Sequence, residues 1–400
     1  MDNAFSSSLF VQSLVAPDTR DLAGEWVSKR QRGKGSRWVL DTSLSPADLY
    51  IYLKARFGPP NGVMMILRAP HSDNFIQWHY TLKSGISDFE ILGLNTRTEF
   101  MISEYDNLGE NDWSALVAEI KRDFKRYGPK LKEVRKHLEH WRLFYNPYYR
   151  LKEIVRRCSG ELAEIIGQSF ELPVDPPAFP KIYTSAQEGL AEDFSEFSTK
   201  IQAIADRYRR VQEVSTSLRL ICPVWAEAFV NFIIFALCRE EIKKDRRIYR
   251  DFITKDIDVR IKLLHINCVG FKKPIDTSHQ KFKSFHSLMN ERNDLLHGNI
   301  DPNKLGYETV YFDGTIPLFT EPQGLARNSL GVSLVGIEPD ETLKRVDIVH
   351  SFVDFTLGHL ERPYEESLTL ILDRRDLGWR AETNRIGVLF SDSIAEGFGR

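Results

Sequence analysis

Three polar residues near the end of one predicted helix have types that can stabilise negative charge and exchange a proton. Arg292, Asn293 and His297 belong to the segment that starts at Lys281 and reads KFKSFHSLMNERNDLLHGN. Asn293 and His297 are four apart and share a helix face, whereas Arg292 lies among apolar neighbours three or four positions away. These neighbours are Leu288, Met289, Leu295 and Leu296. Burying a guanidinium without a partner is expensive, so the sequence predicts a compensating group elsewhere.

An earlier apolar helix offers that group. Residues 224–238 read VWAEAFVNFIIFALC, and Glu227 and Asn231 are the only strongly polar side chains in this run. They are four apart, so both lie on one face of the helix. Two polar patches, each embedded in an apolar helix, are explained if they meet in the core. We predict that Glu227 pairs with Arg292 and fixes the geometry of its guanidinium.

The run Arg292-Asn293-Asp294-Leu295-Leu296-His297 resembles the R-N-x-x-x-H signature of the HEPN superfamily, the higher eukaryotes and prokaryotes nucleotide-binding domains. The motif ends an apolar-striped helix, and the earlier AEAFVNFIIFAL run resembles the first core helix of those domains. The resemblance covers about residues 185–362. It implies that Arg292, Asn293 and His297 are catalytic. Supporting residues would be Glu227, Asn231 and Asp294.

Resemblance to the catalytic members of the family implies a metal-independent endoribonuclease without a cofactor. The RNA 2′-hydroxyl would attack the adjacent phosphorus, and a histidine suits the proton exchange that this step needs near neutral pH. A fixed arginine stabilises the charge of the phosphorane, an effect of about 10²-fold or more. Asn293 would orient the phosphate or hold His297 in one tautomer. The products would be a 2′,3′-cyclic phosphate and a 5′-hydroxyl, and DNA would be inert.

One helix supplies a single motif histidine, and HEPN nucleases generally place two motifs across a twofold axis. The resemblance therefore implies a homodimer, with RNA as substrate and a regulatory trigger or antitoxin as a further partner, as in toxin and anti-phage defence proteins. The alternative is a non-catalytic HEPN module that binds RNA or a nucleotide and does not need His297. A structural helical adaptor would explain the amphipathic helices but not the buried polar set.

A basic stretch precedes this region. Residues 113–157 contain thirteen Lys or Arg against five Asp or Glu, with aromatic side chains interleaved. Such a stripe could steer and stack single-stranded RNA, and the RNA-binding candidates are Lys121, Arg122, Lys125 and Arg126. In the alternative reading, these cations solvate long helices while the aromatic rings face the core. For any individual residue we favour this alternative.

Composition narrows the class of protein. The formal net charge is −2 and the apolar fraction is 42%, as in ordinary globular domains. The four cysteines show neither C-x-x-C spacing nor a disulfide framework, which favours a reducing compartment. No secretory signal begins the chain, and the apolar run 224–238 is too short to span a bilayer. His137 and His140 have metal-pair spacing but no apparent third ligand. We therefore predict a cytoplasmic protein with no membrane segment and no metal site.

The expected fold is α+β, in four parts. A small, mostly antiparallel α+β domain occupies residues 1–112 and acts as sensor or targeting domain, with strands at 37–40, 62–69, 74–82, 89–94 and 99–104 and a helix capped by Ser45. Residues 113–184 form a basic helical spacer with a proline-rich linker at 172–180. Residues 185–362 form the HEPN-like helical bundle. Its helices are expected at 186–220, 224–239 and 281–297 and from 340 onward. A β-hairpin at 307–319 turns at Asp313-Gly314. Residues 363–400 form an extension with strand-like runs at 368–372 and 386–390.

Overall fold

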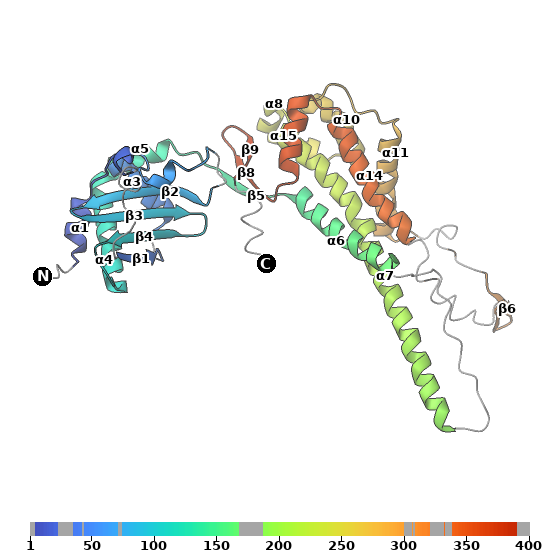
Figure 1. Ribbon diagram of the computed structural model, residues 1–400. Coiled ribbons are helices and arrows are strands. Elements are labelled where there is room, and N and C mark those ends of the chain that lie inside the picture. The colour runs from blue at the N-terminus through green and yellow to red at the C-terminus, as the bar shows by residue number, and fades with distance from the viewer. Residues whose placement is uncertain are drawn as a thin grey trace. The chain divides into compact units, whose positions relative to one another are not determined.

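The computed structural model describes residues 5–22, 35–41, 44–70, 74–167, 187–299, 306, 309–320, 332 and 338–389 (Figure 1). The chain divides into two compact units, one made mainly of residues 1–142 and the other mainly of residues 143–379. An antiparallel sheet characterises the first unit and helices dominate the second, so the predicted α+β class is confirmed. The unit boundary divides the predicted spacer at 113–184, and the proline-rich linker lies outside the described residues.

The first unit is built on a four-stranded antiparallel sheet. Its strands are β1 (Gly35–Val39), β2 (Ile76–Ser84), β3 (Ser87–Leu94) and β4 (Thr98–Ser103), in the order β1-β4-β3-β2. Gly85, with a φ of +62°, makes the tight two-residue loop between β2 and β3. The predicted strand at 62–69 is wrong, because this segment holds only the 3-10 turn η1 (Val63–Met65). It meets the sheet edge through a bond from the Gly62 N–H to the His79 carbonyl.

Helices cover one face of this sheet. They are α1 (Ser7–Ser13), α3 (Pro46–Phe57), α4 (Glu110–Phe124) and α5 (Gly128–Lys136), with the 3-10 turn η2 (Lys125–Tyr127) between the last two. Ser45 caps α3 as predicted, since its Oγ accepts a 3.0 Å bond from the Asp48 N–H. Trp113 and Leu116 of α4 are buried with Phe100 of β4, so α4 belongs to the core of this unit. The first part of the predicted spacer therefore belongs to the core of the first unit and does not connect two domains.

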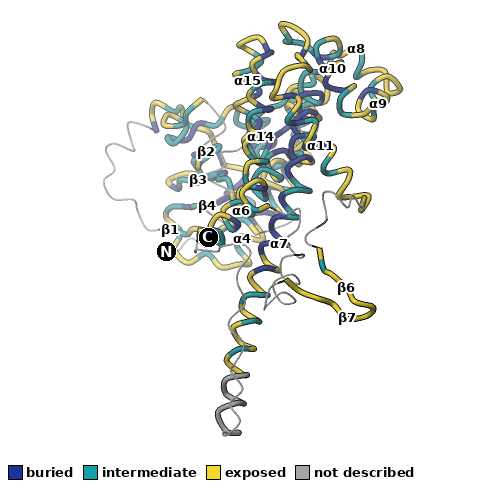
Figure 2. The backbone as a smooth tube through the Cα atoms, turned by 90° about the vertical axis from the view of Figure 1, so that its right-hand side faces the viewer, coloured by how far each residue is buried: buried dark blue, intermediate teal, exposed yellow. Residues whose placement is uncertain are grey.

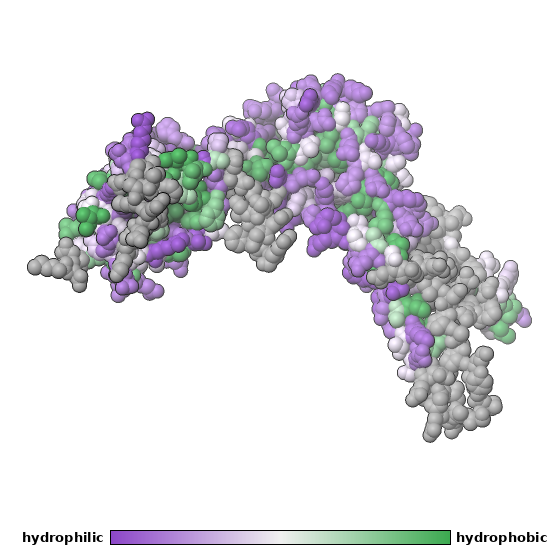
Figure 3. All heavy atoms as spheres, viewed as in Figure 1, coloured by the Kyte–Doolittle hydropathy of each residue, from purple (hydrophilic) through white to green (hydrophobic). Residues whose placement is uncertain are grey.

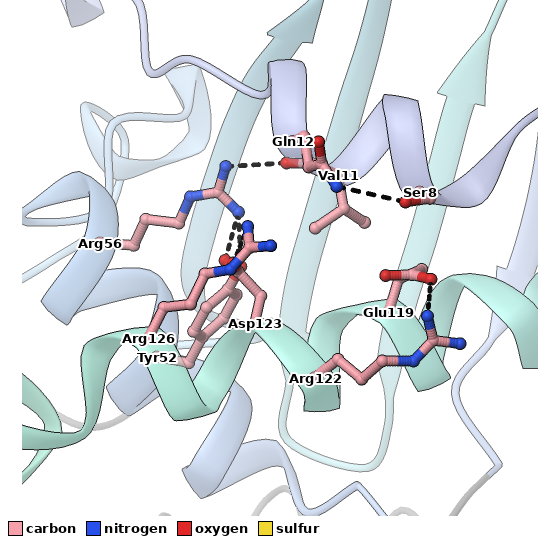
Figure 4. A network of polar contacts seen from close by, with 9 residues as sticks. All are labelled: Ser8, Val11, Gln12, Tyr52, Arg56, Glu119, Arg122, Asp123 and Arg126. Atoms are coloured by element: carbon pink, nitrogen blue, oxygen red, sulfur yellow. Dashed lines mark hydrogen bonds and ion pairs between the residues drawn. The ribbon is translucent and has the colours of Figure 1, made fainter.

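A buried ionic network locks α1, α3 and α4 together (Figure 4). The Asp123 carboxylate accepts 2.7 Å bonds from the Tyr52 hydroxyl and from Arg56, whose second Nη donates to the Val11 carbonyl at 2.7 Å. Arg126 adds a 3.2 Å bond to the other oxygen of Asp123. Burial raises the pKa of Tyr52, and its bond to Asp123 raises that pKa further. Each buried charge in this network thus has a partner.

The second unit is a helical bundle around one central helix. Its helices are α6 (Pro147–Gly167), α7 (Gln187–Leu237), α8 (Glu240–Lys244), α9 (Arg246–Thr254), α10 (Ile257–Asn267), α11 (Gln280–His297), α14 (Pro339–Leu357) and α15 (Arg362–Leu372). Helix α7 packs against α6, α10, α11 and α14, and Figure 2 shows its buried residues where these helices flank it. On the face drawn in Figure 3, mostly hydrophilic side chains cover the described parts, with apolar groups in smaller patches.

Helix α7 differs from the two helices that were expected at 186–220 and 224–239. It runs without interruption through Pro223. A proline inside a helix removes one intrahelical hydrogen bond, but Cys222 and Trp225 on either side are fully buried, and their packing outweighs that loss. Among the described helices, α7 alone is long and apolar enough to cross a membrane. In the most apolar 18-residue stretch of α7, 56% of the residues are buried inside the protein. The position of α7 in the core therefore accounts for its apolar composition.

The remaining elements correct or support the expectations for the carboxy-terminal part. The strand-like run 368–372 lies in helix α15, whereas the run at 386–390 overlaps β9 (Arg385–Val388). β5 (Arg142–Tyr145), β8 (Asp376–Arg380) and β9 form a three-stranded sheet in the order β5-β8-β9. The predicted hairpin is present as β6 (Tyr311–Asp313) and β7 (Ile316–Leu318), with Gly314 at φ +60° in its loop.

Candidate functional site

The predicted pairing of Glu227 with Arg292 is confirmed. The Arg292 Nη1 donates to the Glu227 Oε2 at 3.0 Å, which joins α11 to the central helix α7. The two side chains keep 19% and 26% of their surface, so the pair is half-buried and still reaches solvent. Arg292 is therefore held at the edge of the core and has not been withdrawn from the surface.

A second arginine shares this carboxylate. Arg260 of α10 donates from one Nη to Glu227 and from the other to the Asn231 Oδ1. Its side chain is only 8% exposed. Asn231 was predicted from the sequence and Arg260 was not, although Arg260 lies three residues after Ile257 and four before Leu264, on an apolar face.

The charges of this cluster depend on one another. Burial by itself raises the pKa of the Glu227 carboxyl, but the hydrogen bonds and positive charges of Arg260 and Arg292 outweigh it and hold that pKa below its ordinary value. Glu227 is consequently ionised at neutral pH. Two guanidiniums around one carboxylate leave the cluster with a net positive charge, which suits an anionic ligand such as a phosphate.

Helix α10 has a further tie to α11. The His286 Nε2 lies 2.9 Å from the Asp258 Oδ2, and the Asn290 Nδ2 lies 3.2 Å from the His286 Nδ1. Both ring nitrogens of His286 are thus occupied, so this histidine acts as a structural link. It helps to hold Arg260 and Arg292 on the same side of α7.

The other motif residues lie on the exposed end of α11. Asn293 accepts bonds from the Nε and Nη2 of Arg292 at 3.3 and 3.1 Å, so it orients the guanidinium. Asp294 accepts a 3.0 Å bond from the Asn299 side chain and closes the helix end, where Gly298 takes φ +61°. His297 is the last residue of α11 and is exposed. Within the described residues, its ring has no hydrogen-bond partner.

Only two of the four apolar neighbours predicted around Arg292 are buried. Leu288 and Met289 are buried as expected, but Leu295 and Leu296 are 36% and 63% exposed. Helical spacing shows which residues share a face; it does not show how far the partner surface extends along the helix. The last turn of α11 therefore presents leucines to solvent beside His297.

The predicted RNA-binding residues lie in the first unit, around the end of α4. Arg122 pairs with Glu119, and Arg126 pairs with Asp123 of the buried network. Lys125 is exposed, and Lys121 is half-buried. Phe124 and Tyr127 pack against the core of the unit, which agrees with the reading that the aromatic rings face inward. The positive charge is present there, but no row of exposed aromatic rings accompanies it on α4.

A groove of about 280 Å³ lies between α11 and α14, on another face of α11. Its lining includes Lys283, Arg345 and Glu291, but none of the predicted catalytic residues. Arg345 is bound to Glu291 at 2.8 Å. This neutralisation makes the groove a weaker candidate for an anion than the cluster around Arg292.

No known protein family, characterised protein or solved structure matches this chain significantly. Across the described ranges, no three His, Cys, Asp or Glu side chains converge as metal ligands do. The functional argument consequently depends on the residues of the cluster and the motif themselves.

Proposed function

We propose that the second unit is a HEPN-type endoribonuclease that cleaves RNA without a metal ion. The observation that carries this proposal is the Arg292 guanidinium, which Glu227 and Asn293 hold in one orientation five residues before the exposed His297. A fixed cation and an exposed imidazole near the end of the same helix would supply the charge stabilisation and the proton exchange that 2′-hydroxyl transesterification needs. The R-N-x-x-x-H resemblance supports the same assignment.

Arg292 has donors to spare for a substrate. A guanidinium carries five N–H groups, and the described contacts use one on Nη1, one on Nη2 and the one on Nε. Within the described residues, two N–H groups are left for the non-bridging oxygens of a phosphodiester. Glu227 and Asn293 fix the plane of the fork, so the cost of ordering it is met before the substrate binds. His297 would act as general base or acid at the 2′-hydroxyl or the leaving oxygen.

A second copy of the chain would complete the acid–base pair. The exposed Leu295 and Leu296 adjoin His297 and provide an apolar contact for an isologous interface through α11. We expect Leu296→Glu to weaken self-association of the full chain by at least about tenfold in sedimentation velocity, because it would place like charges at a twofold contact. Leu370→Glu is the matched control, since Leu370 is a similarly exposed helical leucine on α15. A wild-type chain that stays monomeric at high micromolar concentration would contradict the dimer.

The proposal is tested by incubating the purified chain with structured and unstructured RNA in excess EDTA. We expect cleavage that persists without divalent metal and leaves 2′,3′-cyclic phosphate ends, while a DNA strand of the same sequence stays intact. Cleavage that requires a divalent metal would exclude this mechanism.

The second candidate function is a non-catalytic RNA- or nucleotide-binding module. It is favoured by one observation: within the described residues, no side chain orients the ring of His297. RNA binding without cleavage in the same assay would select this alternative. In either case, the first unit would serve as sensor or targeting domain of a cytoplasmic defence or toxin protein with a separate trigger or antitoxin.

A further inference from the structure

Two buried cysteines face each other at the ends of the helices that hold the cluster. Cys238 directly follows α7, which carries Glu227, and Cys268 directly follows α10, which carries Arg260. The two residues form an isolated antiparallel bridge. Both are free thiols in the core of the second unit, 4% and 1% exposed.

The backbone bonds around this bridge define its geometry. The Val269 N–H donates to the Leu237 carbonyl and the Arg239 N–H donates to the Asn267 carbonyl, both at 2.9 Å. These bonds flank the cysteines, so Cys238 and Cys268 occupy a non-hydrogen-bonded pair position, where opposite Cα atoms lie about 4.5 Å apart and side chains are closest. That separation falls within the range over which a disulfide can form.

The surroundings favour a reactive thiol at one of the two positions. The hydrogen bond with the Cys268 thiol lowers the pKa of Cys238, and the nearby Lys243 ammonium lowers it further, against the effect of burial. The same hydrogen bond and burial raise the pKa of Cys268. A more acidic thiol next to a less acidic one is the arrangement of an attacking and a resolving cysteine.

We propose that Cys238 and Cys268 are a site of reversible oxidative modification that takes a hydroperoxide as oxidant and closes to an intramolecular disulfide. The Cys238 thiolate attacks the terminal peroxide oxygen, the O–O bond breaks, and Cys238 becomes a sulfenic acid. The leaving oxygen takes up a proton and departs as water when the oxidant is hydrogen peroxide, or as an alcohol when it is an organic hydroperoxide. Cys268 then attacks the Cys238 sulfur, the S–O bond breaks, and a water leaves. Two thiols lose two electrons and two protons in total, and a dithiol reductant reverses the change.

The disulfide would fasten α7 to α10 covalently. Besides their apolar packing, these helices are joined by the bridge and by the bonds from Arg260 to Glu227 and Asn231, so oxidation would add a covalent link to the support of Arg292. The closed loop spans about 30 residues, and we expect oxidation to raise the melting temperature of the second unit by about 5–10 °C. This inference does not depend on RNA cleavage.

The test treats the reduced full chain with hydrogen peroxide, then alkylates it in denaturant and maps its peptides without reduction. We expect two alkylated thiols instead of four, and a disulfide between the peptides that contain Cys238 and Cys268, with fragment ions separating Cys238 from Cys222. Dithiothreitol should restore four. Four thiols after peroxide, or a disulfide between other cysteines, would overturn the proposal.

Two serine variants test whether the disulfide depends on the facing position of Cys238 and Cys268 or on how exposed a thiol is. Cys158→Ser removes a more exposed thiol and should leave both the disulfide and the thermal shift unchanged. Cys268→Ser should abolish both. The peptide map of the wild-type chain stands by itself if a serine variant folds poorly. A Cys238–Cys268 disulfide that leaves the melting temperature unchanged would overturn the proposed fastening of α7 to α10.

Discussion

His297→Ala is expected to lower the rate of RNA cleavage by about 10²- to 10⁴-fold while RNA affinity and the melting temperature stay nearly unchanged. The magnitude is that of a lost general acid or base. The stability should be nearly constant because His297 is exposed and its ring has no described hydrogen bond. At most, the variant loses the modest interaction of a histidine with the end of its helix, below about 1 kcal/mol.

The matched control for this substitution is His137→Ala. His137 is also exposed and also stands at the carboxy-terminal end of a helix, α5, in the first unit. It should leave the cleavage rate unchanged. Arg292→Lys completes the set, because a lysine keeps the charge beside Glu227 but loses the planar fork, and we expect a loss of at least about tenfold.

The kinetic split between the variants distinguishes catalysis from binding. Single-turnover rates and RNA dissociation constants should be measured for all three proteins. His297→Ala should affect the rate alone, whereas Arg292→Lys should weaken both the rate and the affinity. An unchanged rate in His297→Ala would remove the histidine from the mechanism. Equal losses of cleavage rate in the His297 and His137 variants would mean that the effect comes from removing a histidine at a helix end and not from the site.

The polar cluster could be predicted from the sequence only where a polar residue interrupts a long apolar helix. Glu227 and Arg292 met this condition, and their pairing followed. Arg260 did not meet it, because α8, α9 and α10 together cover 240–267 in pieces of eleven residues or fewer, too short for a clear helical period. A carboxylate with one predicted partner therefore turned out to have two.

The fold was predictable where local signals are strong, as at the Ser45 cap, the strands of the sheet and the Gly314 hairpin. It was not predictable where tertiary packing decides. Proline usually ends a helix, yet α7 continues through Pro223 because the packing of the buried residues around it stabilises the helix. The spacing of Leu368 and Leu372 fits a strand or a helix. In the second unit both are buried as residues of helix α15.

Glu227→Gln is expected to destabilise the second unit by about 3 kcal/mol at neutral pH. The substitution keeps the shape of the side chain but leaves two guanidiniums, one of them nearly buried, without their countercharge. RNA cleavage should fall as well, because Arg292 would lose the partner that orients it. Glu213→Gln is the matched control on the same helix. Glu213 also pairs with an arginine, but both side chains are 54% exposed, and the loss should stay below about 1 kcal/mol.

The pH dependence of the same variant identifies the charge as the cause. The pKa of Glu227 is lowered in the folded protein, so its contribution is present above the ordinary carboxyl value of about 4.3 and disappears as the pH falls through the lower, folded value. The stability difference between wild type and Glu227→Gln should consequently be largest near pH 7 and shrink steadily below about pH 4. Urea unfolding of the second unit at several pH values measures it. A difference that stayed constant across this range would mean that packing, and not the carboxylate charge, holds α7 to α10 and α11.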